Sequence, residues 1–152
     1  MTSNLNLSFC EITDNGLKYL TNMRSNLDLS YCEQITDSSL KHLTNMRSGL
    51  NLHKCKKITD DGLKHLTNIK SDLNLYGCNI TDKGLKNLTN MTSGLRLSDW
   101  VTDESLKYLT NMRSDLDLLN CEKITGEGFK YLSNMTSGLN LSFGRNITDS
   151  GL

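Results

Sequence analysis

A unit of about 23 residues recurs along the whole chain, and this repeat constrains the fold more than any other feature of the sequence. Successive units begin 22, 23, 23, 22, 21 and 23 residues apart, measured between the first leucines of seven Leu-x-Leu pairs. Units of this length cannot bury an apolar face alone, so they stack on their neighbours in an elongated array. The first leucines of the pairs are Leu5, Leu27, Leu50, Leu73, Leu95, Leu116 and Leu139.

Each unit predicts a strand followed by a short helix. Apolar residues alternate in the Leu-x-Leu pair, which is the period of a strand. From the Ile-Thr-Asp triplet onward the period changes, and Ile35, Leu40, Leu43 and Met46 fit one face of a short helix. The length of the unit varies only between the cysteine position and the following Ile, which indicates a surface loop there.

Polar residues at fixed positions support the helix. Thr opens the helical part in all seven units, as at Thr36, and its hydroxyl suits an N-cap. Asp follows this Thr in six units, and its negative charge favours the N-terminus of a helix. Lys stands four residues after the Asp, as Lys41 does after Asp37, and this spacing predicts an ion pair between them. A small residue, such as Gly62 and, in the last unit, Gly151, lets neighbouring helices approach closely.

The residue before each internal Leu-x-Leu pair is always Gly, Asn or Asp. These residues adopt a left-handed backbone, with positive φ, at the lowest cost. The position follows the helix and precedes the strand, so we interpret it as a left-handed helix C-cap and predict positive φ at most of the six sites. The six residues are Asn26, Gly49, Asp72, Gly94, Asp115 and Gly138.

The charge balance and hydropathy exclude several classes of function. Lys plus Arg and Asp plus Glu both number 17, so no partner attracted by bulk charge, such as nucleic acid or an anionic membrane, is expected. The first residues show no secretory signal, and no apolar run is long enough to span a membrane.

The five cysteines stand alone in separate units, without a Cys-x-x-Cys pair. This spacing suits neither a zinc site nor a disulfide framework, so a reducing, cytoplasmic or nuclear compartment is expected. Asn-x-Ser triplets fall inside predicted strands, as at Asn6 and Asn140, where a glycan does not fit, in agreement with that compartment. The cysteines are Cys10, Cys32, Cys55, Cys78 and Cys121.

The repeated pattern resembles the leucine-rich repeat. The stretches CEQITDSSLKHL and CEKITGEGFKYL are similar to the cysteine-containing subfamily, which is familiar from the substrate-binding half of F-box proteins. The resemblance covers essentially the whole chain, although the units are shorter than the subfamily norm of about 26 residues and one extra residue precedes each Leu-x-Leu pair. No F-box is expected, because the first repeat begins at Leu5.

The resemblance implies an α/β fold, a right-handed leucine-rich-repeat solenoid (horseshoe) with a concave parallel β-sheet and convex short helices. Residues 1–152 would form a single domain of about six full repeats and a truncated seventh, without visible capping units. Leu, Ile and Met would stack in ladders between the two layers. Each cysteine thiol would donate a hydrogen bond to backbone groups of the adjacent turn.

Catalytic, metal-binding and cofactor-binding sites are not expected. His42 and His65 share one helical position with Tyr19 of another unit, so they are expected to fill surface rather than to bind metal. No Ser or Cys nucleophile has a His and an acid at a suitable spacing, and no Gly-rich phosphate loop follows a strand. The sequence therefore predicts a protein that is not an enzyme and holds no cofactor.

The concave sheet is the predicted partner-binding surface. The row of residues between the paired leucines is nearly uniform, which also fits a structural amide ladder, whereas the outer rows are diverse, which fits either recognition or drift. Trp100 replaces Cys in the fifth unit and fits either core filling or exposed recognition. The candidate partner-binding residues are Asp28, Tyr31, Asn51, His53, Asn74, Tyr76, Arg96, Asp99 and Asp117.

The predicted function is a non-enzymatic protein–protein interaction module that binds a protein partner on this face. Two alternatives stay open. By resemblance, the chain could be the substrate-recognition portion of an F-box type ubiquitin-ligase assembly. It could also be a structural array that self-associates through uncapped ends that expose ladder leucines.

Overall fold

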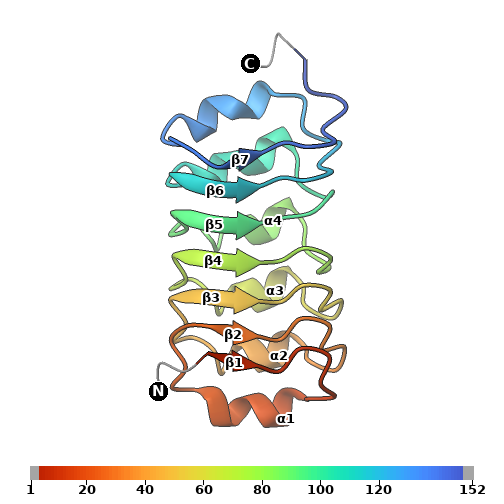
Figure 1. Cartoon of the computed structure of the whole chain (residues 1–152), viewed down its shortest axis with the longest axis vertical. Helices are drawn as coiled ribbons and strands as arrows, with labels where there is room; N and C mark the ends of the chain where they lie inside the picture. Colours follow the sequence, from red (N-terminus) through yellow and green to blue (C-terminus); the bar gives the residue numbers. More distant parts are fainter. Residues whose placement is uncertain (1–3, 149–152) are drawn as a thin grey trace.

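Seven parallel strands form one sheet in chain order, stacked as a single column (Figure 1). The computed structural model describes residues 4–148, so the prediction for Gly151 lies outside the described residues. The strands are β1 (Leu5–Asn6), β2 (Leu27–Asp28), β3 (Ser48–Asn51), β4 (Ser71–Asn74), β5 (Ser93–Arg96), β6 (Ser114–Asp117) and β7 (Leu139–Asn140). This order confirms the predicted α/β solenoid.

Short helices lie behind the sheet (Figure 1). None of them, within residues 4–148, has the length and apolar composition that a membrane crossing requires. The α-helices are α1 (Asp14–Leu17), α2 (Asp37–Leu40), α3 (Asp60–Leu63) and α4 (Asp82–Leu85), and the 3-10 helices are η1 (Lys18–Leu20), η2 (Asp103–Leu109) and η3 (Glu127–Leu132).

The residues predicted to share one helical face are buried as expected, but the helix itself is shorter than predicted. Ile35, Leu40, Leu43 and Met46 are all buried, yet α2 ends at Leu40. Beyond it the chain continues in separate tight turns, closed by hydrogen bonds from Leu43 N–H to Leu40 C=O and from Met46 N–H to Leu43 C=O, both 2.9 Å long. A unit of about 23 residues must return to the next strand, so it leaves no room for a longer helix.

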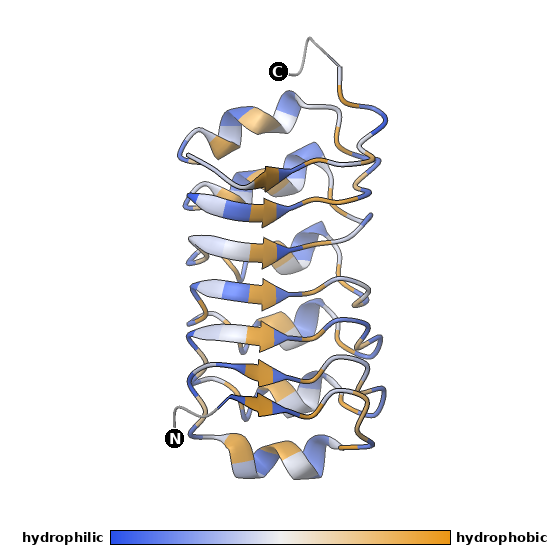
Figure 2. Cartoon of the chain, viewed as in Figure 1, coloured by the Kyte–Doolittle hydropathy of each residue, from blue (hydrophilic) through white to orange (hydrophobic). Residues whose placement is uncertain are grey.

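Leucine ladders form the core between the sheet and the helices. Leu27 pairs in register with Leu5 and Leu50, and Leu73 pairs with Leu50 and Leu95, as the aligned repeats predict. Figure 2 shows the same alignment as hydrophobic residues that recur at one place in successive strands. These contacts hold each repeat against its neighbours, so burial is shared along the array.

The backbone is left-handed at all six predicted positions, with φ from 56° at Asp115 to 69° at Gly138. The C-cap interpretation, however, is wrong. Lys41, which follows α2, has a right-handed backbone with φ of −59°, and Gly49 lies inside β3. The left-handed residue therefore lies within the strand in β3 to β6 and immediately before the strand in β2 and β7, rather than at the end of the helix.

Backbone hydrogen bonds join neighbouring repeats on both sides of this left-handed residue. Just before it, the later strand donates, as Arg47 N–H does to Arg24 C=O at 2.7 Å. Just after it, the earlier strand donates, as Leu29 N–H does to Asn51 C=O at 2.9 Å. The chain has positive φ between these bonds, and Gly, Asn and Asp adopt positive φ at the lowest cost, which explains why only these residues occur there.

Gly alternates strictly with Asn or Asp (Asx) at this position along the array, and the structure gives the reason. A Cβ added to Gly49 would lie 2.6 Å from Oδ1 of Asn26, and one added to Gly94 would lie 2.5 Å from Oδ1 of Asp72. Each Asx side chain thus occupies the space beside the glycine of the next repeat.

Asp–Thr pairs tie each repeat to the next. Asp37 Oδ1 accepts a hydrogen bond from the Thr59 N–H at 2.8 Å, and its Oδ2 accepts one from the Thr59 hydroxyl at 2.6 Å. The predicted Asp–Lys pairs four residues apart are therefore wrong, because these carboxylates bind the next repeat. The same two bonds join Asp14 to Thr36, Asp60 to Thr81 and Asp82 to Thr102.

The Thr N-caps and the small helical residues are confirmed in the central repeats. The hydroxyls of Thr36, Thr59 and Thr81 accept the N–H of the residue two positions on. A Cβ added to Gly62 would lie 2.4 Å from Asp37 Oδ1, so the small residue makes room for the carboxylate of the preceding repeat as well as for its helix.

The cysteines and a row of asparagines also bond between repeats. Cys55 Sγ donates to Leu29 C=O at 3.1 Å, which confirms the predicted role of the thiol. Asn68 Nδ2 donates to Thr44 C=O at 3.0 Å, and this side-chain link was not predicted. Equivalent thiol bonds are made by Cys32, Cys78 and Cys121, and equivalent amide bonds by Asn45, Asn90, Asn111 and Asn134.

Candidate protein-binding surface

Four aromatic rings from four successive repeats form a continuous stack, called the aromatic row below. Phe9 and Tyr31 stack face to face, with centroids 4.4 Å apart and an angle of 9° between the rings. Tyr31 meets His53 edge to face at 5.0 Å, and His53 stacks on Tyr76 at 5.4 Å. The rings come from the turns that follow β1 to β4, at the carboxyl ends of the strands.

The backbone holds the first two rings in an unusual conformation. Phe9 and Tyr31 have φ of 59° and 60°, which is rare for bulky residues. Their N–H groups donate to Ser30 C=O and His53 C=O at 2.9 and 2.8 Å, so each turn is pinned to the next repeat. The aromatic side chains are therefore presented from a rigid frame.

The aromatic row changes its position within the repeat halfway along. In the third and fourth repeats the left-handed residues are Lys54 and Gly77, and the ring comes from the residue before, His53 or Tyr76. Lys54 Nζ lies 5.6 Å from the centroid of the Tyr76 ring, within the range of a cation–π contact. This change of position hid the row from an alignment of equivalent residues.

His53 is the titratable member of the aromatic row. Its Nε2 lies 3.1 Å from the Tyr31 hydroxyl. Burial lowers the pKa of His53 below 6.5, and the positive charges of Lys54 and Arg96 lower it further, while Asp28 acts in the opposite direction. The ring is therefore neutral at pH 7, and the row presents an uncharged surface there.

The central row of the sheet binds its own backbone. Asp28 Oδ1 accepts the Ser30 N–H at 2.8 Å, and Asn51 Oδ1 accepts the His53 N–H at 3.1 Å. Burial opposes ionisation of Asp28, but hydrogen bonds from Ser30 and Asn51 outweigh it and lower its pKa. The same bond to the second residue on is made by Asn6, Asn74, Asp117 and Asn140.

Arg96 interrupts the central row with a side chain that remains about half exposed. Its Nε donates to Asp117 Oδ2 at 2.7 Å, and Asn140 Nδ2 donates to the other oxygen of Asp117 at 3.0 Å. An open depression of the sheet face lies over these residues and Asn74. The guanidinium nitrogens beyond Nε make no hydrogen bond within residues 4–148.

Asp99 and Trp100 lie apart from the aromatic row. Asp99 is exposed and accepts a hydrogen bond from the Ser98 hydroxyl at 3.0 Å. Trp100 is half-buried against the core, which supports the core-filling interpretation of the two left open. Its Nε1 is buried without a hydrogen-bond partner in the described part of the chain.

The nine sequence-predicted residues thus separate into distinct environments. Tyr31, His53 and Tyr76 are brought together in the aromatic row, and Arg96 joins Asp117. Phe9, which completes the stack and is 72% exposed, was not among the candidates. Its signal in the sequence is an aromatic residue two positions beyond the Leu-x-Leu pair, a feature that it shares with Tyr31. The four central-row candidates that bind backbone are Asp28, Asn51, Asn74 and Asp117.

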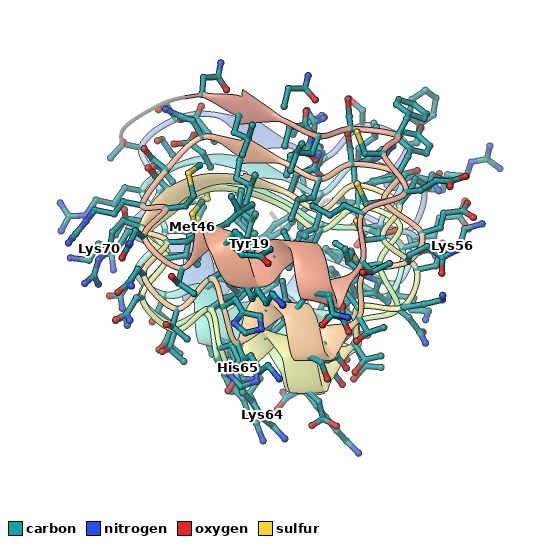
Figure 3. All side chains as sticks on the ribbon, turned by 90° about the horizontal axis from the view of Figure 1, so that it is seen from below. Tyr19, Met46, Lys56, Lys64, His65 and Lys70 are labelled. Carbon is teal, nitrogen blue, oxygen red and sulfur yellow. The ribbon has the colours of Figure 1, made fainter. Side chains whose placement is uncertain are left out.

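Residues 4–148 offer few other groups that could bind a metal or react. Within residues 4–148, no group of three or more His, Cys, Asp or Glu side chains could hold a metal ion. Burial raises the pKa of Cys55 and Cys121 to about 12, so these thiols stay protonated. His65 lies with Lys64 and Tyr19 on the helix side of the molecule (Figure 3). This position agrees with the prediction that His65 fills surface rather than binding a metal.

Comparisons with known proteins agree with the repeat architecture. The family model described as Leucine Rich repeat matches residues 4–20 and 71–88. No curated protein matches the chain. Among solved structures, internalin inlF of Listeria monocytogenes superposes with a TM-score of 0.57 at 18% identity, over 95% of this chain and 46% of that one.

Two further structures share the fold. Internalin C2 (inlC2) of Listeria monocytogenes has a TM-score of 0.54 at 25% identity, over 95% of this chain and 75% of that one. The yeast Rad7 and Elc1 complex contains a chain with a TM-score of 0.64 at 18% identity, over 91% of this chain and 40% of that one. This chain therefore spans less than half the length of the Rad7–Elc1 and inlF chains that it matches.

Proposed function

We propose that this chain, a leucine-rich-repeat solenoid, is a non-enzymatic protein-interaction module that binds a partner through the aromatic row and the adjoining sheet face. The observation that carries the proposal is the four-ring stack of Phe9, Tyr31, His53 and Tyr76, which leaves large apolar rings at the surface. Tyr, Trp and Arg side chains dominate binding energy at protein interfaces.

The row meets the physical requirements of a binding surface. Its rings are already ordered against one another, so binding immobilises few additional rotamers. Phe9 and Tyr31 expose 72% and 38% of their area, and both belong to one continuous stack rather than to scattered positions. Exposed apolar area gathered in this way favours a protein partner.

Arg96 supplies a polar contact near the same face. Because its Nε is held by Asp117, the guanidinium is oriented before a partner arrives. Its outer nitrogens can then form a two-point hydrogen bond with a carboxylate or a carbonyl group. The interface that we propose therefore combines an apolar row with one fixed cation.

A matched pair of variants tests the proposal. A pull-down with the Tyr31→Ala/Tyr76→Ala variant is expected to lose the partners that the unchanged protein captures, while Tyr19→Ala, which removes a ring that is 80% exposed on the helix side, retains them. Thermal unfolding of each variant checks that the array stays folded. Retention of every partner by the double variant would exclude the aromatic row as the interface.

Finer parts of the sequence prediction belong to this proposal. The thiol-to-carbonyl bonds of four cysteines support the cysteine-containing subfamily, and four buried free thiols support a reducing, cytoplasmic or nuclear compartment. The F-box-assembly and self-association hypotheses stay predictions. Capture of a ligase subunit, or growth of light scattering with concentration, would favour the first or the second of them.

A further inference from the structure

A row of cations runs along the side of the array where each chain segment passes from helix to strand. The row, called the edge row below, consists of the residues just before each strand serine. Figure 3 shows its member Lys70 projecting from one side of the solenoid, opposite Lys56. The six positions of the edge row are Arg24, Arg47, Lys70, Thr92, Arg113 and Thr136.

The edge row is held rigidly in register by the backbone. Arg47 N–H donates to Arg24 C=O at 2.7 Å, and Lys70 N–H donates to Arg47 C=O at 2.8 Å. The bonds to Thr92, Arg113 and Thr136 continue the series at 2.8 Å each. Neighbouring positions are therefore about 4.8 Å apart, the spacing of strands in a sheet, and like charges at that spacing repel.

The four cations have no internal partner. Within residues 4–148, the side chains of Arg24, Arg47, Lys70 and Arg113 make no hydrogen bond, ion pair or cation–π contact. On the helix side, Lys64 pairs with Asp61 and Lys107 pairs with Glu104, whereas Lys41 makes no such contact within residues 4–148. Exposed charges without a partner are available to a second molecule.

The chain itself shows that the fold does not need a cation in the edge row. Thr92 and Thr136 occupy the same position, and their hydroxyls each donate to the carbonyl of the preceding position at 3.2 Å. A neutral residue thus gains a local hydrogen bond and avoids repulsion. The cations at the other four positions give up this advantage, which points to a role outside the fold.

We propose that the edge row binds an acidic polypeptide segment of the partner. The proposal rests on the proposed interaction function and adds the chemistry of the partner to it. Arg guanidinium groups match carboxylates in a two-point hydrogen bond, and Arg occupies three of the four positions. From Arg24 to Arg113 the row spans four strand spacings, about 19 Å, which an extended segment of about six residues covers.

A peptide fits this row better than a nucleic acid does. Asp72 and Asp115 are exposed two residues beyond Lys70 and Arg113, so the cationic strip is narrow and bordered by carboxylates. A nucleic acid duplex is wider than one such row and would meet these carboxylates. The whole chain is also neutral, with 17 residues of each sign, so no general attraction for polyanions adds to the local one.

The test uses a fluorescent hexaglutamate peptide, and its affinity is measured by polarisation at low salt. Three proteins are compared: the unchanged chain, an edge variant (Arg24→Gln/Arg47→Gln/Lys70→Gln) and a helix-side variant with the same loss of charge (Lys18→Gln/Lys41→Gln/Lys86→Gln). We expect the edge variant to bind at least about tenfold more weakly, and the helix-side variant to bind as the unchanged chain does.

Three outcomes would overturn the proposal: no binding of the peptide by the unchanged chain, equal weakening by both triple variants, or tighter binding of a single-stranded or duplex DNA of equal charge. Thermal unfolding distinguishes a folding defect, since the edge variant is expected to melt no lower than the unchanged chain. The pull-down with the Tyr31→Ala/Tyr76→Ala variant tests the interaction function separately. The peptide experiment can therefore exclude the edge row as a binding site without excluding the interaction function.

Discussion

Asp37 binds Thr59 of the next repeat through both of its carboxylate oxygens, at 2.8 Å from the Thr59 N–H and 2.6 Å from its hydroxyl. The Thr59 hydroxyl in turn accepts the Asp61 N–H at the start of α3. One carboxylate therefore positions the N-cap of the following helix, and the helices of successive repeats are linked through side chains as well as through the apolar core.

Replacing this carboxylate tests the link. Asp37→Ala removes two charge-assisted hydrogen bonds and leaves the half-buried Thr59 N–H without its acceptor, so we expect a loss of about 2–3 kcal/mol in the free energy of unfolding. Urea denaturation measures it. Asp61→Ala is the control, because Asp61 is exposed and pairs only with Lys64, and we expect no measurable change there. Equal effects of the two substitutions would contradict the link.

The alternation of Gly and Asx predicts a coupling between neighbouring repeats. Gly138→Asp alone places a side chain against Asp115 Oδ1, and we expect this steric conflict to cost more than about 1 kcal/mol. Adding Asp115→Gly removes the opposing side chain and recreates the order found at Gly49 and Asp72. We expect the double variant to recover most of the loss in a double-mutant cycle, and additive effects would show that the alternation carries no packing constraint.

Repetition explains which parts of the fold the sequence predicts. The Leu27 and Leu50 ladder and the positive φ of Gly49 follow from residue types that recur in every unit. The bonds from Asp37 to Thr59 and from Asn68 to Thr44 were missed, because they join residues more than 20 positions apart that only the stacking brings together. The helix C-cap was wrong because a residue with positive φ can also lie within a strand.

The candidate surface was predicted less completely for a related reason. Tyr31, His53 and Tyr76 were identified as variable positions, but they belong to two different alignment rows. Phe9 was missed because its ring contacts Tyr31 only after the turns adopt their left-handed conformation. The edge row was visible in the repeated Met-Arg-Ser sequence, yet its lack of internal partners is a property of the structure alone.

The cysteines differ in reactivity. Only Cys10 is exposed among the five, and burial raises the pKa of Cys55 from 9.0 to about 12. We expect one thiol to react rapidly with a disulfide reagent at pH 8 in the folded protein, and all five to react in denaturant. Substitution of Cys10 by Ser would remove the rapid phase, and rapid reaction of more than one thiol would contradict the buried thiol-to-carbonyl bonds.

The same shift makes stability depend on alkaline pH. The thiol pKa of Cys55 is higher in the folded than in the unfolded chain, so its stabilising contribution is complete below pH 9 and is lost as pH rises through about 12. Urea denaturation at pH 8 and pH 10 measures the change. We expect a Cys55→Ala variant to be less stable at pH 8 and to lose less stability with rising pH than the unchanged chain, and an unchanged pH dependence would contradict this role.

Titration of His53 also makes the stability depend on pH, but with the opposite sign. Its pKa is lowered by burial and by Lys54 and Arg96, so the folded chain binds this proton more weakly than the unfolded chain does. Stability from this group is present above pH 6.5 and is lost as pH falls through the folded pKa. An NMR titration is expected to give a value below 6.5 that rises in Lys54→Gln, and a value at or above 6.5 would contradict the stacked, half-buried ring.

Site-specific photo-crosslinking tests the central claim, that a protein partner binds the aromatic row. A benzophenone side chain is placed at Tyr76, within the row, and in a second protein at Tyr19, on the helix side. The account predicts a crosslinked partner from position 76 and none from position 19. Crosslinking at position 19 alone, or equally at both positions, would contradict it.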